Sequence, residues 1–593
     1  MKILLVNTPW EKEGYYGVRA GARWPHLIEL SDNKKEPRPF VPFPFFMAYA
    51  AAVLQNKGHE VYAIDAIALR LDEIEFLARV VDVSPDVIVQ EVSTPTIVAD
   101  LHYAERMKKA SERSKIIFCG PNHLMQSERF LDANKVVDMV IYGEYEYTLR
   151  NVINELEHDD PTFKMINGII YRDSGRVIKN PPAPLIENLD TLPWPARELF
   201  PIMDYHNDSM GLPSPRLQVW TSRGCPHVCS FCMWPSMMYG GSNYRIRKAK
   251  DVVEEIAFCL KKWKFKSYYF NDDTFNLGRE DLLELAQKIK DHKINLPFSV
   301  SPRANVMDEE QLLALKSAGL YSVKLGIESG SQGLIDKCGK ALNLDKVENF
   351  VNIAKKNGIK IFLTFTLGLP GETDKTIEET ISYALRLDPN DVNFAIITPS
   401  PGSEYYQELN NKGYILSKDW EDYHGHLPVI RTDALSAEDL EKGLHEARKA
   451  WWVQKHIRNK EFDVEVVKKL LSFLTTKNQV YIFVTSYIEH VYEIIYALPE
   501  NINALNLVFI TTKEREQEVD KEFPDQHKIV LQGTSVDPVL LFEKIAKKDK
   551  DFFILPVSNE SGKGYKKIFS YFDKNLSKSF LAITPRGNVL KKI

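Results

Sequence analysis

The sequence predicts an α/β protein made of three or four successive domains. A chain of 593 residues is too long for one hydrophobic core. Short apolar runs with the character of buried strands alternate with helical stretches, and a polar or glycine-bearing loop follows most of these runs. A proline-rich stretch over residues 181–197 separates the first alternating region from the second.

Composition narrows the class of protein. With 44% hydrophobic and 26% charged residues, the chain has the composition of a soluble globular protein. The net charge is −5 and the basic residues are spread along the chain, so charge gives no indication of nucleic-acid binding. No apolar run approaches the roughly 18 residues of a membrane span, and the run after Met1 is too short for a signal peptide. Six cysteines, three of them in one short run, indicate a reducing compartment, so we expect a cytoplasmic protein.

Residues 1–150 predict a first α/β domain with a doubly wound, Rossmann-like parallel sheet. A helix is expected over residues 45–57, with Gly58 at its end. The expected strands are residues 2–7, 60–65, 86–90, 115–119 and 136–142. The polar loops after these strands lie where such sheets bind their ligands. No G-x-G-x-x-G motif follows the first strand, which argues against a dinucleotide site.

Residues 151–214 predict a connector. A β-hairpin is expected over residues 166–178, with Asp173, Ser174 and Gly175 at its turn. The prolines that follow fix an extended linker rather than a helix. The simplest role of this segment is to dock the domains on either side of it.

Residues 215–420 predict the catalytic core, in which a strand over 217–221 leads into a cysteine loop. Cys225, Cys229 and Cys232 stand at C-x3-C-x2-C spacing, so that their thiolates can converge on one soft metal centre. A [4Fe–4S] cluster usually takes four cysteines. Three local ligands without an obvious fourth indicate a cluster with one iron left open for a small molecule.

Two other interpretations of the cysteine loop exist. Structural zinc prefers paired knuckles with a complete ligand set, which this run lacks. Cysteines also pack well in apolar cores, but Gly224 and Pro226 mark this stretch as a loop. The distant Cys259 and Cys338 are expected to be packing residues rather than ligands.

Further strands in the core each end in a polar or glycine-bearing loop. They are expected over residues 268–270, 297–300, 322–325, 361–366 and 393–397. Strand and helix alternation of this kind suits a partial or full β/α barrel, whose active groups gather at the carboxyl ends of the strands.

The cysteine spacing, with the aromatic Phe231 just before the third cysteine, resembles the signature of the radical S-adenosylmethionine (SAM) enzymes. The resemblance implies that the open iron chelates the amino and carboxylate groups of SAM, and that reductive cleavage gives a 5'-deoxyadenosyl radical. It also implies SAM-binding roles for Phe231 and for residues of the later loops. These are Asp272, Asp273, Ser301, Arg303, Gly326 and Glu328.

Each of these roles has a chemical reason and an alternative. Asp272 and Asp273 fit the amino group or the ribose, which need acceptors, while Arg303 offers a fork for the carboxylate. Gly326 would let backbone approach the adenine, and Glu328 would brace the site. The alternatives are helix capping for Asp273 and a structural ion pair for Asp272 or Arg303.

The order of elements in residues 1–150 resembles the cobalamin-binding domain found ahead of the core in one large radical SAM subfamily. That subfamily's Gly-Gly-Pro-His loop is matched by residues 119–122, where Cys119 replaces a glycine, and its Gly-Glu-x-Glu loop by residues 143–146. The resemblance implies a cobalamin site at the strand ends. The candidate residues are Thr8, Pro9, Ser93, Thr94, Gly120, Pro121, Asn122, Gly143, Glu144, Tyr145 and Glu146.

A D-x-H-x-x-G motif, whose histidine ligates cobalt in many other cobalamin proteins, is absent. Asp100 and His102 imitate its start, but Glu105 stands where the glycine belongs, and the stretch lies in an expected helix. His102 is therefore expected on a helix surface, and cobalamin is expected base-off without a histidine on cobalt. The alternative is a vestigial Rossmann-like domain that holds no corrinoid.

The subfamily includes anaerobic magnesium-protoporphyrin ester cyclases and class B radical SAM methylases. The resemblance implies a cobalamin-dependent methyltransferase that passes a methyl group from SAM, through methylcobalamin, to an unactivated carbon or a phosphorus of a small molecule. An external low-potential electron donor such as flavodoxin or ferredoxin is implied as a partner. A cyclase or rearrangement enzyme remains an alternative, and a non-catalytic cobalamin or redox sensor is one of another class. A tRNA methylthiotransferase is disfavoured because the first domain holds only Cys119.

Residues 421–593 give the weakest signal. A helix over 436–457 and strands over 480–485, 505–511, 528–532, 552–556 and 580–584 predict a further small α/β domain. The stretch contains no phosphate loop, metal cluster or catalytic triad signature. Its role in substrate binding, dimerisation or scaffolding is left open, and no residue of the chain is assigned as catalytic.

Overall fold

The structure is a computed structural model of the chain. It describes residues 1–452 with gaps at 13–14, 19–25, 30–39, 206–209, 276, 424 and 426, then residues 454–455 and six strands in 480–592. The chain divides into two compact units, Met1–His445 and Glu446–Ile593. Predictions that fall on 456–479 and on the segments between the six strands lie outside the described residues.

The first sheet of unit Met1–His445 has seven strands in the order β10-β9-β8-β7-β6-β1-β5. Its strands are Lys2–Asn7 (β1), Glu60–Asp65 (β5), Val87–Glu91 (β6), Lys115–Cys119 (β7), Met139–Ile141 (β8), Ile169–Asp173 (β9) and Arg176–Lys179 (β10). The strands β5, β1, β6, β7 and β8 pair in parallel. Their order follows the 2-1-3-4-5 doubly wound topology, which places a ligand site at the carboxyl ends of β1 and β6.

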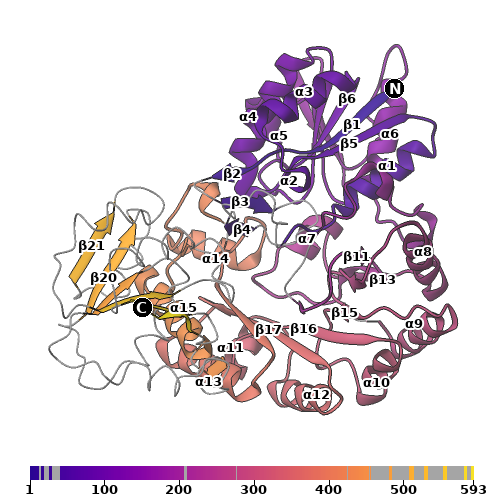
Figure 1. Cartoon of the computed structure of the whole chain (residues 1–593). Coiled ribbons are helices and arrows are strands. Elements are labelled where there is room, and N and C mark those ends of the chain that lie inside the picture. Colours follow the sequence, from indigo (N-terminus) through magenta and orange to yellow (C-terminus); the bar gives the residue numbers. More distant parts are fainter. Residues whose placement is uncertain are drawn as a thin grey trace. The chain divides into compact units, whose positions relative to one another are not determined.

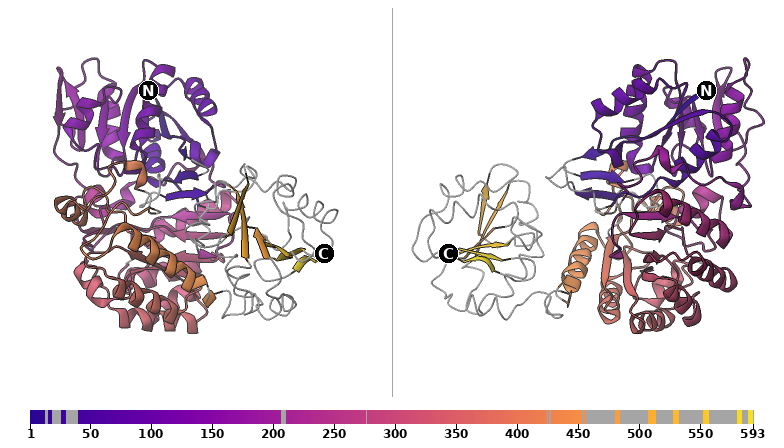
Figure 2. Two further views of the ribbon diagram at one scale, coloured as in Figure 1. Left: turned by 90° about the vertical axis from the view of Figure 1, so that its left-hand side faces the viewer. Right: turned by 45° about the vertical axis from the view of Figure 1, so that its right-hand side comes forward.

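Helices cover both faces of this sheet (Figures 1 and 2). They are Phe45–Gln55 (α1), Ala66–Leu69 (α2), Glu73–Val83 (α3), Ile97–Ala110 (α4), Glu128–Ala133 (α5) and Glu146–Leu156 (α6). Alternate residues of the strands feed the buried clusters beneath the helices, as Leu4 and Val6 do with Phe76 and Val80. The predicted α/β domain is thus confirmed, with β1 and β6 buried almost throughout as parallel strands require.

The hairpin that the sequence assigned to the connector belongs to this sheet. Strand β9 pairs antiparallel with β8, and β10 pairs antiparallel with β9. Ser174 and Gly175 at the turn have φ values of 50° and 79°, which suit the tight turns favoured in hairpins. The prolines beyond it run without a long element, past the short 3-10 turns Leu189–Thr191 and Arg197–Leu199. The division of the chain near residues 150, 214 and 420 stays a prediction.

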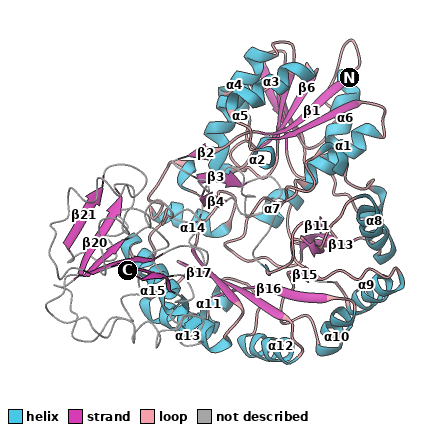
Figure 3. Ribbon diagram, in the orientation of Figure 1, coloured by secondary structure: helices cyan, strands magenta, loops and turns pink. Residues whose placement is uncertain are grey.

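The second sheet has six parallel strands in chain order, β11-β14-β15-β16-β17-β18. The strands are Arg216–Val219, Ser267–Phe270, Phe298–Val300, Leu320–Glu328, Lys360–Leu367 and Asp391–Ile396. The helices between them are Ala249–Lys262 (α8), Arg279–Asp291 (α9), Glu309–Ser317 (α10), Gln332–Lys337 (α11), Leu344–Lys356 (α12) and Asp374–Leu387 (α13), followed by Glu404–Lys412 (α14). Figure 3 shows this alternation, with α8, α9, α10 and α12 in an arc along one side of the strands. The arrangement suits the expected partial barrel, with β11 and β18 at its edges.

Two small antiparallel sheets were not predicted. Ser222–Cys225 (β12) and Asn243–Ile246 (β13) form a hairpin around the cysteine loop, which also holds the short helix Trp234–Tyr239 (α7). Glu11–Lys12 (β2), Tyr15–Val18 (β3) and His26–Glu29 (β4) form a three-stranded sheet after β1. Both are built from short or polar runs that carry little periodic signal.

In the second unit, six strands form a sheet in the order β21-β20-β19-β22-β23-β24. They are Val480–Phe483, Leu507–Thr512, His527–Leu531, Phe552–Pro556, Phe580–Ile583 and Val589–Lys592, numbered β19 to β24. Only β24 pairs antiparallel. The order matches the 3-2-1-4-5-6 Rossmann topology, which agrees with the predicted α/β domain. The helix Ala437–Trp452 (α15) lies where the sequence predicted one. Across the described residues, no helix is long and apolar enough to cross a membrane.

Candidate functional site

The cysteine loop is held by a two-stranded hairpin. Cys225 ends β12, and Gly224 pairs with Tyr244 of β13. Gly224 has φ of 92°, and a Cβ there would lie 2.3 Å from the backbone oxygen of Asn243. Only glycine fits this close approach of the two strands. The local sequence therefore fixes how the chain enters the loop.

The three thiols lie close enough to influence one another. Burial raises the pKa of Cys225 and raises that of Cys232 to about 12, and the charge of Cys229 acts in the same direction on both. Backbone N–H groups of His227 and Trp234 oppose these shifts. All six cysteines of the chain are free thiols. A bound cationic centre would favour the thiolates of Cys225 and Cys232 against this effect of burial.

The three thiols are donors of the type that a [4Fe–4S] cluster takes. Among the described residues, no three His, Cys, Asp or Glu side chains converge closely enough to hold one metal ion. Tetrahedral zinc requires such convergence. In a [4Fe–4S] cube each thiolate binds a different iron, so the sulfurs stay apart. The donor set is therefore compatible with the predicted cluster.

Asp272 and Asp273, at the end of β14, brace the cysteine hairpin. Asp272 is fully buried, and its carboxylate accepts hydrogen bonds from the Thr221 N–H (2.6 Å) and hydroxyl (2.6 Å) and from the Ser222 N–H (2.9 Å). Burial raises its pKa to about 7, against the effect of these donors. The oxygen Oδ2 of Asp273 accepts from the Gly224 N–H (2.8 Å) and the Tyr239 hydroxyl (2.7 Å). In the structure, both carboxylates thus accept hydrogen bonds from the protein itself, beneath the cysteine loop.

Arg303 lies beside the cysteine loop. Its guanidinium donates to the backbone oxygens of Lys340 and Ala341. Its charge acts on both Cys225 and His227. Its Nε is buried and has no hydrogen-bond partner within the described part of the chain. Among the described residues, Arg303 is thus held by backbone oxygens rather than by an acidic partner.

Ser301 directly follows β15, and Gly326 and Glu328 are among the last residues of β16. The Ser301 hydroxyl lies 3.0 Å from that of Tyr269. Glu328 pairs with Lys340 at 3.2 Å and accepts from the Thr366 hydroxyl at 2.8 Å. A register shift between Gly326 and Glu328 puts Glu328 at φ of 74°, a strained conformation typical of functional sites. A Cβ at Gly326 would lie 2.5 Å from Glu328 Oε1, so the glycine makes room for this side chain.

A second layer of contacts to the cysteine loop was missed by the sequence. The Ser230 N–H donates to the backbone oxygen of Cys338 (2.9 Å), and the Tyr405 N–H donates to that of Ser230 (2.9 Å). Cys338 is buried close enough for Cys229 to raise its pKa, after burial itself, to about 12. Phe231 is buried, at 7% exposure. No sequence signal links these segments, because they lie more than 100 residues apart in the chain.

On the first domain, Thr8 and its neighbours form a buried hydrogen-bond network at the end of β1. The Thr8 hydroxyl donates to Asp100 (3.1 Å), which also accepts from Thr96 (2.6 Å) and Gln90 (3.0 Å). Pro9 follows directly in the chain. His102 lies on the exposed surface of α4 beside Glu73, as expected. The end of β1 is therefore shaped by Asp100 rather than by a histidine.

The loops after β6 and β7 lie against each other. The Asn122 amide donates to the backbone oxygen of Ser93 (2.9 Å), and its carbonyl accepts from the N–H of Leu124 (2.9 Å). A Cβ at Gly120 would lie 2.9 Å from the Val92 oxygen, so Gly120-Pro121 passes tightly over β6. Asn122 thus ties the two loops together, while the buried Thr94 hydroxyl has no partner in the described residues.

The Gly143–Glu146 loop contacts the cysteine hairpin instead of standing free. Glu144 lies 3.0 Å from Arg223 and 2.6 Å from Arg245, and Glu146 lies 2.6 Å from Arg223. Tyr145 is buried and donates to Glu91 (2.8 Å). The two arginines hold both oxygens of Glu144 and Oε1 of Glu146, while the buried Oε2 of Glu146 has no hydrogen-bond partner among the described residues. Direct contact of these two carboxylates with a ligand stays a prediction.

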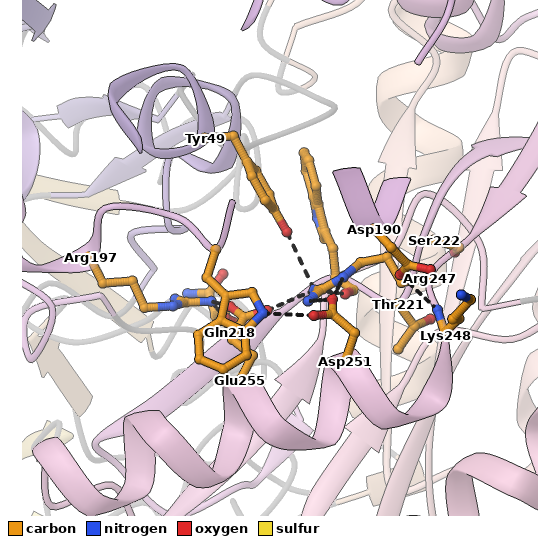
Figure 4. A network of polar contacts seen from close by, with 12 residues as sticks. Tyr49, Asp190, Arg197, Gln218, Thr221, Ser222, Arg247, Lys248, Asp251 and Glu255 are labelled. Carbon is orange, nitrogen blue, oxygen red and sulfur yellow. Dashed lines mark hydrogen bonds and ion pairs between the residues drawn. The ribbon is translucent and has the colours of Figure 1, made fainter. Parts of the chain in front are cut away.

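Aromatic rings and further buried ion pairs lie between the first domain and the core, next to these contacts of Glu144 and Glu146. We call this buried contact region the seam. The Trp220 ring stacks on Phe45 with centroids 4.2 Å apart. Figure 4 shows the adjoining network, in which Arg247 meets Glu255 (2.7 Å) and the Tyr49 hydroxyl (3.4 Å), while Arg197 meets the other oxygen of Glu255 (2.7 Å). Residues of α1 and of the core are thereby packed into one continuous interior.

The carboxyl ends of the two sheets of Met1–His445 meet across this seam. A Cβ at Gly402, in the loop after β18, would lie 3.0 Å from His123, in the loop after β7. Buried polar atoms without a partner among the described residues lie in loops from both sides. Among them are Thr94 Oγ1, His227 Nε2, Ser230 Oγ, Arg303 Nε and Thr398 Oγ1. Native proteins rarely leave such atoms unsatisfied, so these loop atoms are candidates for contact with a ligand or a water.

Comparisons with known proteins agree with this geometry. Residues 220–384 match the radical SAM superfamily, and residues 38–153 match the B12 binding domain. An uncharacterized methyltransferase of Pyrococcus horikoshii is 28% identical over 418 residues, which are 70% of this chain and 89% of that protein. An anaerobic magnesium-protoporphyrin IX monomethyl ester cyclase of Rubrivivax gelatinosus is 27% identical over 412 residues, which are 67% and 71% of the two chains.

A solved structure shares the fold. It is the radical SAM methyltransferase TsrM of Kitasatospora setae with cobalamin and a [4Fe–4S] cluster bound, at a TM-score of 0.54 and 17% identity over 69% of this chain and 78% of that one. The two domain matches confirm the resemblance that the cysteine spacing and the order of the N-terminal elements indicated.

Proposed function

Because the chain joins a B12-binding domain to a radical SAM domain, we propose that it is a cobalamin-dependent radical SAM methyltransferase. It transfers a methyl group from SAM, by way of cobalamin, to an unactivated carbon or a phosphorus of a small molecule. The observation that carries the proposal is that loops at the carboxyl ends of the two sheets meet, as Gly402 and His123 do, and that these loops include Thr94 and Arg303, each with a buried polar atom that has no partner among the described residues. A site lined from both sides suits two cofactors that must reach one substrate.

The residues of the core would hold the cluster and SAM. Cys225, Cys229 and Cys232 bind the cluster, and Asp273 keeps the Gly224 end of their hairpin in place. The free Nε of Arg303 is the donor available to the SAM carboxylate. Glu328, set by its ion pair with Lys340, faces the same end of the sheet. When bound, the cofactors supply the electron transfer, the radical and the methyl carrier.

The residues of the first domain would hold the corrinoid and exclude water. The ends of β1 and β6 flank the topological switch point, and this supports Thr8, Pro9, Ser93 and Thr94 as residues of the corrinoid site. The Thr94 hydroxyl is the buried donor available there. The buried seam keeps solvent from the reacting groups, as radical chemistry requires. Electrons come from a small low-potential donor protein of the flavodoxin or ferredoxin kind.

Anaerobic reconstitution tests the proposal. The purified chain is loaded with iron, sulfide and hydroxocobalamin, reduced in the presence of SAM, and its products are identified by mass spectrometry. Bound cobalamin together with S-adenosylhomocysteine supports the methyltransferase. Formation of 5'-deoxyadenosine alone, with cobalamin bound, favours a cyclase or rearrangement enzyme, a second candidate that the cyclase relative supports. A reconstituted chain that binds no cobalamin contradicts both.

A further inference from the structure

Two arginines stand side by side on the hairpin that carries the cluster ligands. Arg223 of β12 and Arg245 of β13 are directly paired across the two strands. Only Gly224 separates Arg223 from Cys225 in the chain. Any movement of these arginines is therefore passed to the first cluster ligand through a short stretch of strand.

Both arginines are paired with acids of the first domain. We call Glu144 and Glu146 the acidic clasp. Arg223 meets both, at 3.0 and 2.6 Å, and Arg245 meets Glu144 at 2.6 Å. The Arg223 side chain is 2% exposed and Glu146 is 0% exposed. Since two positive charges face two negative ones in the interior, the cluster of charges is balanced only while the hairpin and the clasp stay together.

Further contacts tie the same loop to both ends of the cysteine loop. The Arg223 guanidinium also lies 5.0 Å from the ring centres of Phe46 and Trp220, which hold it in place. A Cβ at Gly143, just before the clasp, would lie 3.5 Å from the Met238 oxygen of α7, beyond the third cysteine. The Gly143–Glu146 loop thus contacts the chain before Cys225 and after Cys232.

The ionisation of the clasp follows from these contacts. Burial opposes the charge on Glu144, but Arg223 and Arg245 outweigh it and lower its pKa. Burial dominates at Glu146 and raises its pKa. Among the described residues, Glu146 pairs with Arg223 alone, whereas Glu144 also meets Arg245 and the Ile186 N–H, so Glu146 is the sensitive point of the clasp.

We propose that the acidic clasp couples the B12-binding domain to the cluster, so that bound corrinoid slows loss of iron from Cys225, Cys229 and Cys232. The inference rests on the proposed function and on the predicted place of the Gly143–Glu146 loop in the corrinoid site. Its carboxylates face the arginines, and its backbone is left for the corrinoid. A ligand that orders this loop stabilises the hairpin behind it and so strengthens binding of the cluster. By linkage, the bound cluster strengthens corrinoid binding by the same factor by which the corrinoid strengthens cluster binding.

Iron release from the full-length, anaerobically reconstituted protein tests the coupling. Iron captured by a ferrous chelator is followed by absorbance, with and without saturating hydroxocobalamin. Hydroxocobalamin is expected to slow the release several-fold in the wild-type chain and to have no such effect in Glu146→Gln. Arg197→Met, which removes a buried arginine of the same seam outside the hairpin and the clasp, is expected to keep the protection.

A second measurement needs no variant. The affinity for hydroxocobalamin of the chain with and without its cluster should differ by the factor found for iron release. Bound hydroxocobalamin that leaves iron release unchanged overturns the coupling and leaves the proposed function standing. Full protection in Glu146→Gln overturns the role of the clasp. Failure to bind hydroxocobalamin at all overturns the coupling and the proposed function together.

Discussion

Replacing Asp273 by alanine should loosen the cysteine hairpin. Oδ2 of Asp273 accepts from the Gly224 N–H at 2.8 Å and from the Tyr239 hydroxyl at 2.7 Å. Each donor left without an acceptor costs about 1–3 kcal/mol, and the site is only partly buried, so the two together cost about 2–4 kcal/mol. Because 1.4 kcal/mol is a factor of ten, local opening of the hairpin should become about 30-fold to about 1000-fold more frequent.

The assay is the rate at which anaerobically reconstituted protein loses iron to a ferrous chelator. Asp273→Ala should release iron faster by a factor in that range. Asp273→Asn is the matched control, since its oxygen still accepts both hydrogen bonds while the charge is lost, and it should give a smaller increase. Iron loss at the wild-type rate in Asp273→Ala, together with weaker SAM binding, would refute the bracing role and return Asp273 to direct ligand contact.

Three further predictions follow from single residues. Cys229→Ala should abolish the cluster, and a variant with full iron content and unchanged absorbance near 400 nm would refute the ligand assignment. Arg303→Lys keeps the charge but loses the Nε donor. The affinity for SAM, measured by equilibrium dialysis, should therefore fall about tenfold. An unchanged affinity would show that Arg303 contacts only the backbone of the protein. Burial raises the pKa of Glu372 from 4.5 to about 7, so the folded state holds an extra proton and stability should fall by roughly 3 kcal/mol as pH rises from 4.5 through 7. Glu372→Gln should flatten the unfolding free energy measured over that range, and an unchanged slope would contradict the shift.

Helices and strands could be predicted where apolar and polar residues follow a regular pattern along the chain. The strand Phe552–Pro556 and the helix beginning at Phe45 lie where the apolar runs placed them. The hairpin turn at Ser174 and Gly175 was readable because positive φ values favour such residues. The sheet of β2, β3 and β4 was missed, because strands of two to four residues carry too little alternation to be recognised.

The candidate ligands of the cluster could be proposed from the sequence because they lie in one loop. Cys225, Cys229 and Cys232 need only their own spacing to be brought together. Cys338, in contrast, was interpreted as a packing residue. It is buried, yet its backbone oxygen accepts from Ser230 of the cysteine loop. Nothing in the local sequence of α11 indicates that neighbour.

The sequence by itself determined which chemistry the chain carries: the thiol spacing, the alternating strands and helices, and the polar residues at the strand ends. The tertiary structure alone decided what each polar residue meets. Asp272 accepts hydrogen bonds from the backbone of Thr221 and Ser222. Glu144 forms ion pairs with Arg223 and Arg245. The physical reason is that a buried carboxylate must find donors or a cation. Whether these come from a ligand or from the protein depends on residues about 50 to 100 positions away, which no local pattern specifies.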